Sequence, residues 1–324
     1  DIRRILVAKA AAGVDVRVIY DDFGSIFVLP DNFEADLDKD GVKTRCFQRY
    51  IPILNARLNN RDHRKIAVVD GKVAFTGGIN IADEYINEKL RFGHWKDCGI
   101  KLTGNAAWNM TVLFLSMWDY LGGEPESESY NAYLPEDFGN VTASGVVQPY
   151  TDNPLDCELV GENIYLGMAN RATKYIYIMT PYLIIDNQME TALCTAAKSG
   201  IDVRIITPGV PDKFFVHECT RSFYPELIKS GVKIFEYTPG FVHSKTFVAD
   251  GQYATVGTVN LDYRSLYLHF EWGVWMYNSS AIGDVKNDFL ETQTLCHEIT
   301  EEDCKTGFFR SLLRKVLVVF APLL

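Results

Sequence analysis

The feature that most constrains the fold is a stretch that the chain contains twice. Residues 63–80 read HRKIAVVDGKVAFTGGIN, and residues 243–260 read HSKTFVADGQYATVGTVN. Eight of the eighteen positions are identical, among them His, Lys, Asp, two Gly and the final Asn. A fold for this chain therefore has to accommodate two copies of one local structure.

Three further similarities occur in the same order around these copies. Chance similarity seldom preserves the order of four segments, so we interpret the chain as a duplication. Its predicted units are 1–122 and 158–324, joined by a polar, acidic linker or surface loop at 123–157. The matching segments are AAAGVDVRVIYD from residue 10 and AAKSGIDVRIITP from 196, GVK at 41 and 231, and DCGIKL from Asp97 and EWGVWM from Glu271.

Each unit has the pattern of alternating helices and strands. Residues 1–12 and 186–199 have helical spacing, and each segment is followed by a glycine where a helix C-cap is expected. An alternating β-branched segment and a strand pair joined by Asp-Gly follow in both units. The predicted fold is α/β, with two duplicated units related by a pseudo-two-fold axis and the active site at their interface.

The second unit has an extra predicted strand, 174–186, before its helix. The first unit has no counterpart, and residue 1 is Asp instead of Met. We therefore expect the first unit to be incomplete at its N-terminus and the chain to be a segment of a longer protein.

Composition limits the partners. The net charge of -10 over 324 residues argues against a broad nucleic-acid surface, because phosphate-backbone binding relies on clustered Lys and Arg. The seven cysteines include no CxxC pair and indicate a reduced compartment. Cys296 and Cys304, with His297, match no usual metal-ligand spacing. No run of 18 apolar residues occurs, so no spanning helix is predicted.

The C-terminal segment, 308–324, combines a dense apolar set with basic residues. One interpretation is a terminal helix docked on the core, which we favour slightly. The alternative is a segment in a membrane interface, with its apolar side down and Arg310, Arg314 and Lys315 toward anionic headgroups.

The repeated stretch carries the candidate chemistry. His and Lys are two residues apart in each copy, so on a strand both side chains leave the same face. Lysines and asparagines can hold and neutralise the non-bridging oxygens of a phosphodiester. One neutral His can attack phosphorus and the other can protonate the leaving alcohol, with no metal or cofactor required. The candidate residues are His63, Lys65, Asn80, His243, Lys245 and Asn260.

A nucleophilic imidazole needs its other nitrogen occupied, so that the correct tautomer faces the phosphate. Asp97 and Glu271 hold equivalent places in the two units, and we predict that they orient His63 and His243, respectively. Asp70 and Asp250 belong to the repeated motif as well, and we expect them to support the turn or the lysine. The remaining histidines, His94, His217, His269 and His297, lack such support.

These motifs resemble the phospholipase D superfamily. The segments GGINIADEY, HWKDCGIKLTG, TPYLIID and the long stretch around His243 are similar to bacterial cardiolipin synthases over nearly the entire chain. This resemblance implies transfer of a phosphatidyl group between two phosphatidylglycerol molecules with release of glycerol, at an anionic bacterial cell membrane. It also implies membrane helices upstream of residue 1, a catalytic part in the cytoplasm and His63 as the nucleophile. His269 stands where we expect Asn.

Two alternatives stay open. Water in place of the lipid alcohol would make the protein a phospholipase D or, less readily, a nuclease, for which a basic-aromatic stripe is missing. A membrane-binding scaffold with a decayed site is the other, although both motifs are intact.

Overall fold

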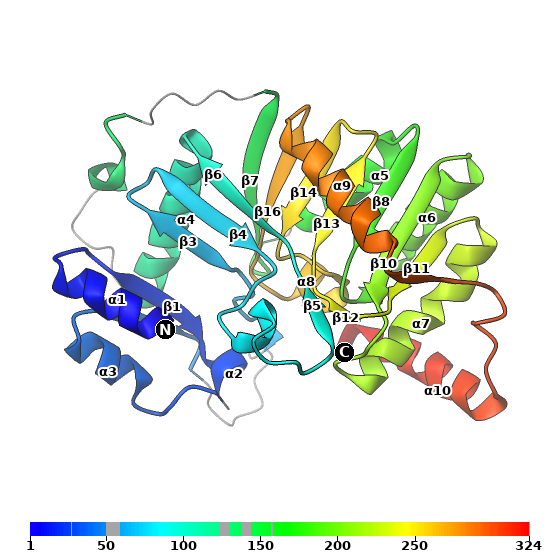
Figure 1. Cartoon of the computed structure of the whole chain (residues 1–324), viewed down its shortest axis with the longest axis horizontal. Helices are drawn as coiled ribbons and strands as arrows, with labels where there is room; N and C mark the ends of the chain where they lie inside the picture. Colours follow the sequence, from blue (N-terminus) through cyan, green and yellow to red (C-terminus); the bar gives the residue numbers. More distant parts are fainter. Residues whose placement is uncertain (27, 50–58, 124–129, 138–143, 157, 324) are drawn as a thin grey trace.

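The computed structural model describes the chain except residues 27, 50–58, 124–129, 138–143, 157 and 324. It has an α/β fold built from two units that repeat one order of elements (Figure 1). The helices predicted at 1–12 and 186–199 are α1 (Ile2–Ala11) and α6 (Asn187–Lys198). The predictions of the fold class and of the duplication are therefore confirmed.

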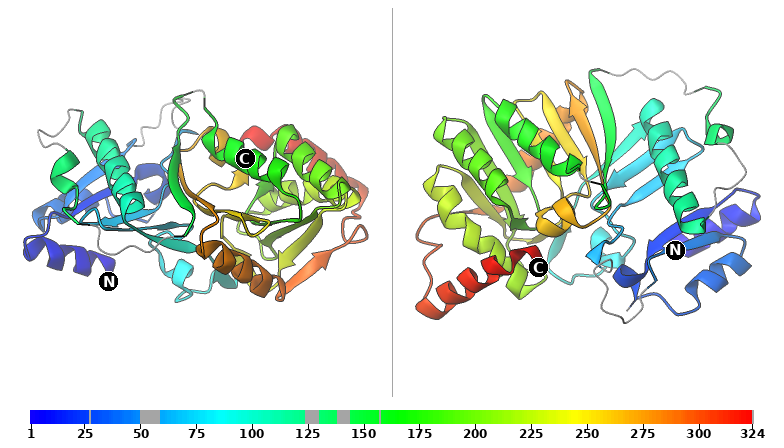
Figure 2. Two further views of the ribbon diagram at one scale, coloured as in Figure 1. Left: turned by 90° about the horizontal axis from the view of Figure 1, so that it is seen from above. Right: turned by 180° about the vertical axis from the view of Figure 1, so that it is seen from behind.

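The second unit is built on an eight-stranded mixed sheet. Helices α5, α6 and α7 pack on one face of this sheet and α9 on the other, so both faces are buried (Figure 2). The strands in spatial order are β17 (Cys296–Ile299), β11 (Lys233–Tyr237), β10 (Asp202–Pro208), β8 (Tyr175–Met179), β13 (Thr246–Ala249), β14 (Tyr253–Gly257), β16 (Glu271–Tyr277) and β7 (Val146–Asp152). The helices are α5 (Val160–Arg171), α6, α7 (Phe214–Lys229), α8 (Tyr263–Tyr267), α9 (Ala281–Gln293) and α10 (Phe308–Val319).

The first unit repeats this order in two separate sheets. One consists of β1 (Arg17–Asp21) and β2 (Lys43–Phe47), and the other of β3 (Ile66–Val69), β4 (Val73–Gly77) and β6 (Gly99–Thr103). In the second unit β8 joins the equivalent strands, β10 and β13. No strand in the described ranges takes that position between β1 and β3. The helices of this unit are α1, α2 (Asp22–Ser25), α3 (Phe33–Lys39) and α4 (Asn105–Gly122).

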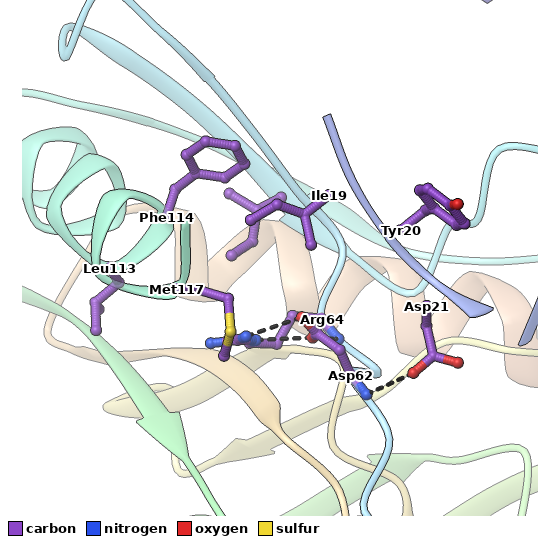
Figure 3. A pocket seen from close by; sticks show the side chains of 9 residues that line it. Ile19, Tyr20, Asp21, Asp62, Arg64, Leu113, Phe114 and Met117 are labelled. Atoms are coloured by element: carbon purple, nitrogen blue, oxygen red, sulfur yellow. Dashed lines mark hydrogen bonds and ion pairs between the residues drawn. The ribbon is translucent and has the colours of Figure 1, made fainter. Parts of the chain in front are cut away.

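A small pocket lies at this interruption of the first unit's sheet. Its lining comes from β1, from the segment around β3 and from α4 (Figure 3). Because its position corresponds to that of β8, we do not assign it to a substrate. Asp62 and Arg64 point toward it and are hydrogen-bonded to one another. His63 lies between them in the sequence, and in an extended segment the side chain of the middle residue points to the opposite side.

The two units meet through paired backbone and a shared apolar core. β5 (His94–Lys96) of the first unit pairs in parallel with β12 (Gly240–Val242) of the second. One core cluster combines Leu102 and Met110 of the first unit with Trp272 and other side chains of the second. The units are therefore held in a fixed relation.

The predicted linker, 123–157, needs a correction. Its residues Val146–Asp152 form β7, which pairs antiparallel with β16 from Val146 opposite Tyr277 to Asp152 opposite Glu271. Tyr130–Tyr133 form a short 3-10 helix, and 124–129, 138–143 and 157 lie outside the described residues. The β-branched alternation in GVVQPYTD is the strand signal that the acidic composition of this range obscured. The division into units at 1–122 and 158–324 stays a prediction.

Helix α10 docks on the rest of the chain through one side only. Leu317 and Ala321 are buried against Ile184 and Cys219, as the docked-helix interpretation predicts. The expectation that its arginines face lipid headgroups is wrong, because Arg310 and Arg314 both bind the buried carboxylate of Glu218. No described helix is both long and apolar enough to cross a membrane.

Candidate active site

The structure brings the two motif histidines into equivalent pairs that cross between the units. His63 Nδ1 lies 2.9 and 3.0 Å from the two carboxylate oxygens of Glu271, and His243 Nδ1 lies 2.9 Å from Asp97 Oδ2. Our prediction that each carboxylate orients the histidine of its own unit is therefore wrong. Each histidine takes its carboxylate from the other unit.

Backbone pairing explains the exchange. The segment before His243 is β12, and its pairing with β5 continues into a bond from His243 N to the carbonyl of Lys96, directly before Asp97. In the same way, His63 N donates to the carbonyl of Phe270, directly before Glu271. Each histidine is thus fixed by main-chain bonds to the residue that precedes its carboxylate.

Further donors hold each carboxylate. Asp97 accepts hydrogen bonds from the indole Nε1 of Trp95 at 3.1 Å and from Cys98 N at 2.8 Å. Glu271 is completely buried and accepts a hydrogen bond from the hydroxyl of Thr258, which in turn accepts one from Trp272 N. With its oxygens fixed in this way, each carboxylate holds the imidazole Nδ1–H and leaves Nε2 as the reactive nitrogen.

The two lysines occupy equivalent, enclosed positions. Lys65 Nζ donates to the carbonyl of His63 at 2.6 Å, and Lys245 Nζ makes the same contact with the carbonyl of His243. Lys245 is almost fully buried. Both ammonium groups therefore sit beside the histidines, with donors left for a bound anion.

Burial shifts the pKa of every group in this cluster. Desolvation lowers the pKa of His63 to about 4, against the opposing effect of Glu271, and that of His243 to about 3, with Lys245 contributing. Desolvation also lowers the pKa of Lys65 to about 8 and that of Lys245 to about 7. Both imidazoles are therefore neutral at pH 7 when no anion is bound.

The pKa values of the two carboxylates are lowered as well, but by their charged or hydrogen-bonding neighbours and against the effect of burial. Burial alone would raise their pKa values, but His63 and His269 hold the pKa of Glu271 well below its usual range, and His243 and Lys245 lower that of Asp97. Both carboxylates are thus ionised at neutral pH, as the orienting role requires.

The asparagines lie in two different environments. Asn80 Nδ2 donates to the hydroxyl of Tyr85, whose ring packs edge-on against His243 at 5.4 Å. Asn260 is buried, and its Oδ1 has no hydrogen-bond partner among the residues that the structure describes. Their role in holding a phosphate stays a prediction.

Of the two supporting roles expected for the motif aspartates, the structure shows the turn for Asp250. Asp250 does not hold Lys245; its carboxylate accepts hydrogen bonds from the amides of Thr173, Lys174 and Tyr175 at the start of β8. Asp70 and Asp250 have left-handed backbone, φ 52° and 57°, in the turns after β3 and β13. Each aspartate comes five positions after its lysine, with a four-residue strand between them, which places the two about 17 Å apart along the chain. Asp250 therefore ties its hairpin to β8, and both aspartates lie at the far end of the strand from their lysines.

Several supporting residues were missed from the sequence. Asp21, at the end of β1, accepts hydrogen bonds from the side chain of Arg61 and from Asp62 N, and so anchors the segment that leads to His63 (Figure 3). Thr258 and Trp95 hold the carboxylates. The one available signal was Thr258, which stands where the first copy of the motif has Gly78.

That replacement reflects a close contact in the first unit. A Cβ atom on Gly78 would lie 2.1 Å from Asp97 Oδ1 and 2.8 Å from the carbonyl of His243. We expect Gly78→Ala to displace Asp97, to destabilise the protein by roughly 1–3 kcal/mol and to lower activity. Gly99→Ala is the matched control, because its Cβ would lie 3.6 Å from the nearest heavy atom. Denaturant unfolding and turnover of both variants test this, and equal behaviour would contradict it.

The other histidines differ in their relation to the site. His269 lies beside the first pair, with its ring 5.6 Å from that of His63. His94 is hydrogen-bonded to Tyr237, and His297 lies on the surface, 3.7 Å from Asp303. Among the described residues, one group of three side chains has its ligand atoms within 4.8 Å of one another, His63, His269 and Glu271, and Cys296, His297 and Cys304 form no such group.

Comparisons with known proteins identify the family of this chain. The sequence matches the family described as cardiolipin synthase, phospholipase D-like domain, over residues 1–90 and 165–292. It is 46% identical to an uncharacterised protein of Streptococcus mutans, covering all of this chain and 70% of that protein. It is 37% identical to a cardiolipin synthase of Alkalihalophilus pseudofirmus, covering all of this chain and 64% of that enzyme.

A solved structure shares the fold. The phosphatidylserine synthase of Haemophilus influenzae superposes with a TM-score of 0.72 at 16% identity, over 99% of this chain and 84% of that one. The chain thus spans somewhat less than two thirds of the length of the A. pseudofirmus relative, and its own fold is that of the H. influenzae enzyme.

Proposed function

The chain belongs to the cardiolipin synthase family with a phospholipase D-like domain, and from this premise we propose that it is a phosphatidyltransferase that converts two phosphatidylglycerol molecules into cardiolipin and glycerol. The observation that carries the proposal is the pair of crossed His–carboxylate contacts, His63 with Glu271 and His243 with Asp97. They supply two oriented imidazoles, one for each chemical role that the transfer requires.

The first half of the reaction forms a covalent intermediate. His63 Nε2 attacks phosphorus, and the bond between phosphorus and the glycerol oxygen breaks. His243 gives its Nε2 proton to that oxygen, so glycerol leaves as a neutral alcohol. We assign the nucleophile to His63 because its side chain is 23% exposed, against 8% for His243, so it is the more accessible ring.

The second half reverses the roles around the same phosphorus. His243, now neutral, takes the proton of a hydroxyl on the second phosphatidylglycerol. The resulting oxygen attacks phosphorus, and the bond to His63 Nε2 breaks. Lys65 and Lys245 neutralise the charge that grows on the non-bridging oxygens in both transition states.

Substrate binding favours the protonated form of His243, which takes the proton for the first step from solvent. Both histidines have low pKa values in the free protein because they are desolvated beside two ammonium groups. A phosphodiester anion bound between them adds a negative charge next to His243, which raises the pKa of its imidazole. The general acid is therefore charged when the substrate is in place.

The first experiment follows the products of purified protein with phosphatidylglycerol in mixed micelles by mass spectrometry. Cardiolipin together with free glycerol is the expected result. Phosphatidic acid with glycerol would show that water is the acceptor and would make the protein a phospholipase D. Unchanged phosphatidylglycerol would overturn the proposal.

The charge of the two lysines predicts a pH dependence for anion binding. Their lowered pKa values, about 8 for Lys65 and about 7 for Lys245, mean that positive charge is lost as pH rises through this range. The affinity for tungstate, an oxyanion of constant charge here, is therefore expected to fall by up to about 10-fold per pH unit for each lysine above its pKa. Calorimetric titration from about pH 6 to about pH 9 measures it.

Two variants make that titration specific. Lys245→Met removes the group with the lower pKa and is expected to abolish the part of the decline near pH 7. Lys198→Met, on the exposed surface of α6, is the control and is expected to leave the curve unchanged. A pH-independent affinity in the unsubstituted protein would contradict the assignment.

The proposed substrates are lipids, and we extend the proposal to a lipid-facing surface on helix α10. This helix lies at the lower right edge of the molecule in Figure 1 and carries several exposed apolar side chains. Phe308 and Phe309 are 76% and 84% exposed, and the terminal segment packs near α8, directly before His269. The exposed apolar side chains of this face are Phe308, Phe309, Leu312, Val316, Val319 and Phe320.

A second exposed apolar segment lies next to the histidines. The chain between β4 and β5 carries Asn80 and Tyr85, which contact the His243 side of the site. Its apolar side chains Ile81 and Leu90 are 81% and 74% exposed. An apolar rim beside a charged phosphate site fits a lipid, because the headgroup and the acyl chains need different surroundings.

This surface predicts weaker vesicle binding in Phe308→Ser/Phe309→Ser. Removing two rings that would be buried in the interface costs about 3 kcal/mol, or about 100-fold in partitioning. Co-sedimentation with phosphatidylglycerol vesicles measures it. Val69→Ser/Leu155→Ser removes two comparably exposed apolar side chains elsewhere and is expected to bind as the unsubstituted protein does. Equal loss in both double variants would contradict the assignment.

The location we propose is the bacterial cell membrane, with the catalytic units on its cytoplasmic side. The six cysteines in the described part of the chain are all free thiols, which is compatible with a reducing compartment.

A further inference from the structure

His269 is a partly buried imidazole beside the proposed nucleophile, and both of its ring nitrogens are buried without a hydrogen-bond partner among the residues described. Its side chain is 12% exposed. Its Nδ1 lies 3.7 Å from Glu271 Oε1, just beyond hydrogen-bond distance. Buried polar groups are nearly always paired, so we expect these ring nitrogens to have a binding partner that is not part of the described chain.

The second pair of the site has a different residue in this position. Trp95 precedes Asp97 by two residues, as His269 precedes Glu271. The indole Nε1 donates to Asp97, and the ring lies 5.1 Å from that of His243. Trp95 therefore supports its carboxylate and offers no lone pair. His269 replaces that indole with a ring whose neutral form carries one.

We infer that His269, His63 and Glu271 form a binding site for a divalent transition-metal ion of the Zn²⁺, Co²⁺ or Ni²⁺ class. One ligand atom from each residue lies within 4.8 Å of the other two. A tetrahedral ion about 2.1 Å from each ligand separates the ligand atoms by about 3.4 Å. The distances to Glu271 Oε1, 2.9 Å from His63 and 3.7 Å from His269, lie on either side of that value.

The ligand atoms of His63, His269 and Glu271, two nitrogens and one oxygen, indicate which class of metal ion would bind. Two imidazoles and one carboxylate are a donor set that zinc takes in proteins, whereas Mg²⁺ and Ca²⁺ prefer oxygen ligands alone. Glu271 is ionised, so binding to it releases no proton. The ring of His63 is 23% exposed, which gives the ion a way in.

Metal binding at this site is inhibitory, a consequence that rests on the proposed function. In the working state the Nδ1 of His63 carries a proton toward Glu271, and the Nε2 lone pair faces phosphorus. A metal on Nδ1 requires that proton to move to Nε2, which removes the nucleophilic lone pair. The ion also takes the carboxylate that orients the ring, so transfer stops in its first half.

Direct binding tests the site without reference to activity. Isothermal titration with Zn²⁺, and the visible absorption of Co²⁺ in a nitrogen-containing site, are measured on the metal-free protein. One equivalent is expected to bind. His269→Asn is expected to bind at least about 100-fold more weakly, because even the loss of a supporting contact to a ligand costs 10–100-fold.

His297→Asn is the matched control, because this histidine lies on the surface beside Asp303 and outside the proposed ligand set. It is expected to retain the tight equivalent. Tight binding that survives in His269→Asn, or that is lost in His297→Asn, would overturn the proposal. So would the absence of a tight equivalent in the unsubstituted protein.

Activity gives the second measurement. Zn²⁺ is expected to inhibit phosphatidylglycerol turnover, with reversal by a chelator and no effect of equal Mg²⁺. The Zn²⁺ concentration for half-inhibition, taken relative to each variant's own metal-free rate, is expected to rise at least about 100-fold in His269→Asn. An unchanged value would overturn the inhibitory role. Failure of the metal-free protein to make cardiolipin would contradict the proposed function, while the binding titrations would still decide the metal site.

Discussion

Substitution of His63 by alanine is expected to lower phosphatidyl transfer by at least about 10³-fold, because the variant lacks the imidazole to which we assign the covalent intermediate. His243→Ala is expected to lower it by about 10²–10⁴-fold, since the leaving glycerol then receives no proton. The two losses have different causes, and a substrate with a better leaving group separates them.

That substrate is a p-nitrophenyl ester of phosphatidic acid. Its leaving group needs no general acid, so His243→Ala is expected to release one equivalent of p-nitrophenol in a rapid burst and to retain the phosphatidyl group on His63. His63→Ala is expected to give no burst. Rapid-quench kinetics and mass spectrometry of the trapped protein measure both results. A burst in His63→Ala and none in His243→Ala would show that the roles are reversed.

The crossed carboxylates give the second large effect. Glu271→Gln and Asp97→Asn keep the shapes of these side chains but remove the charge that orients each ring and stabilises its protonated form. Each is expected to lower transfer by up to about 10⁴-fold, the effect of the corresponding change in a Ser-His-Asp triad. Circular dichroism and thermal unfolding confirm that the variants are folded.

The same burst assay distinguishes crossed pairs from pairs within one unit. Because Glu271 orients His63, Glu271→Gln is expected to slow the p-nitrophenol burst itself. Asp97→Asn acts on His243 and is expected to preserve the burst while slowing the release of glycerol from phosphatidylglycerol. If Asp97→Asn slowed the burst and Glu271→Gln preserved it, the pairs observed here would not be the functional ones.

Much of the architecture could be predicted from the sequence, because the signals were local and repeated. The duplicated HxKxxxxD stretch implied two equivalent strand pairs, and the glycines after residues 12 and 199 marked helix ends. These features depend on neighbours a few residues away. For that reason the equivalence of Asp97 and Glu271 was also correct.

The exchange of those carboxylates could not be predicted in the same way. Equivalent positions in the sequence indicate that Asp97 and Glu271 have the same role. They do not indicate which of the two histidines each carboxylate contacts. That choice depends on the pairing of β5 with β12, two short strands whose sequences carry no pairing signal. Which of the two expected supporting roles Asp250 takes could not be predicted for a related reason, since its carboxylate binds backbone amides at the start of β8, 75 residues away along the chain.

The crossed pairs also bear on how such a protein could arise. Neither half of the chain contains a histidine together with the carboxylate that orients it. An ancestor with a single copy would therefore have needed two chains, related by a two-fold axis, before it had any complete pair. After fusion of the two copies into one chain, their sequences could change independently. One copy could then have an indole, Trp95, beside its carboxylate and the other an imidazole, His269.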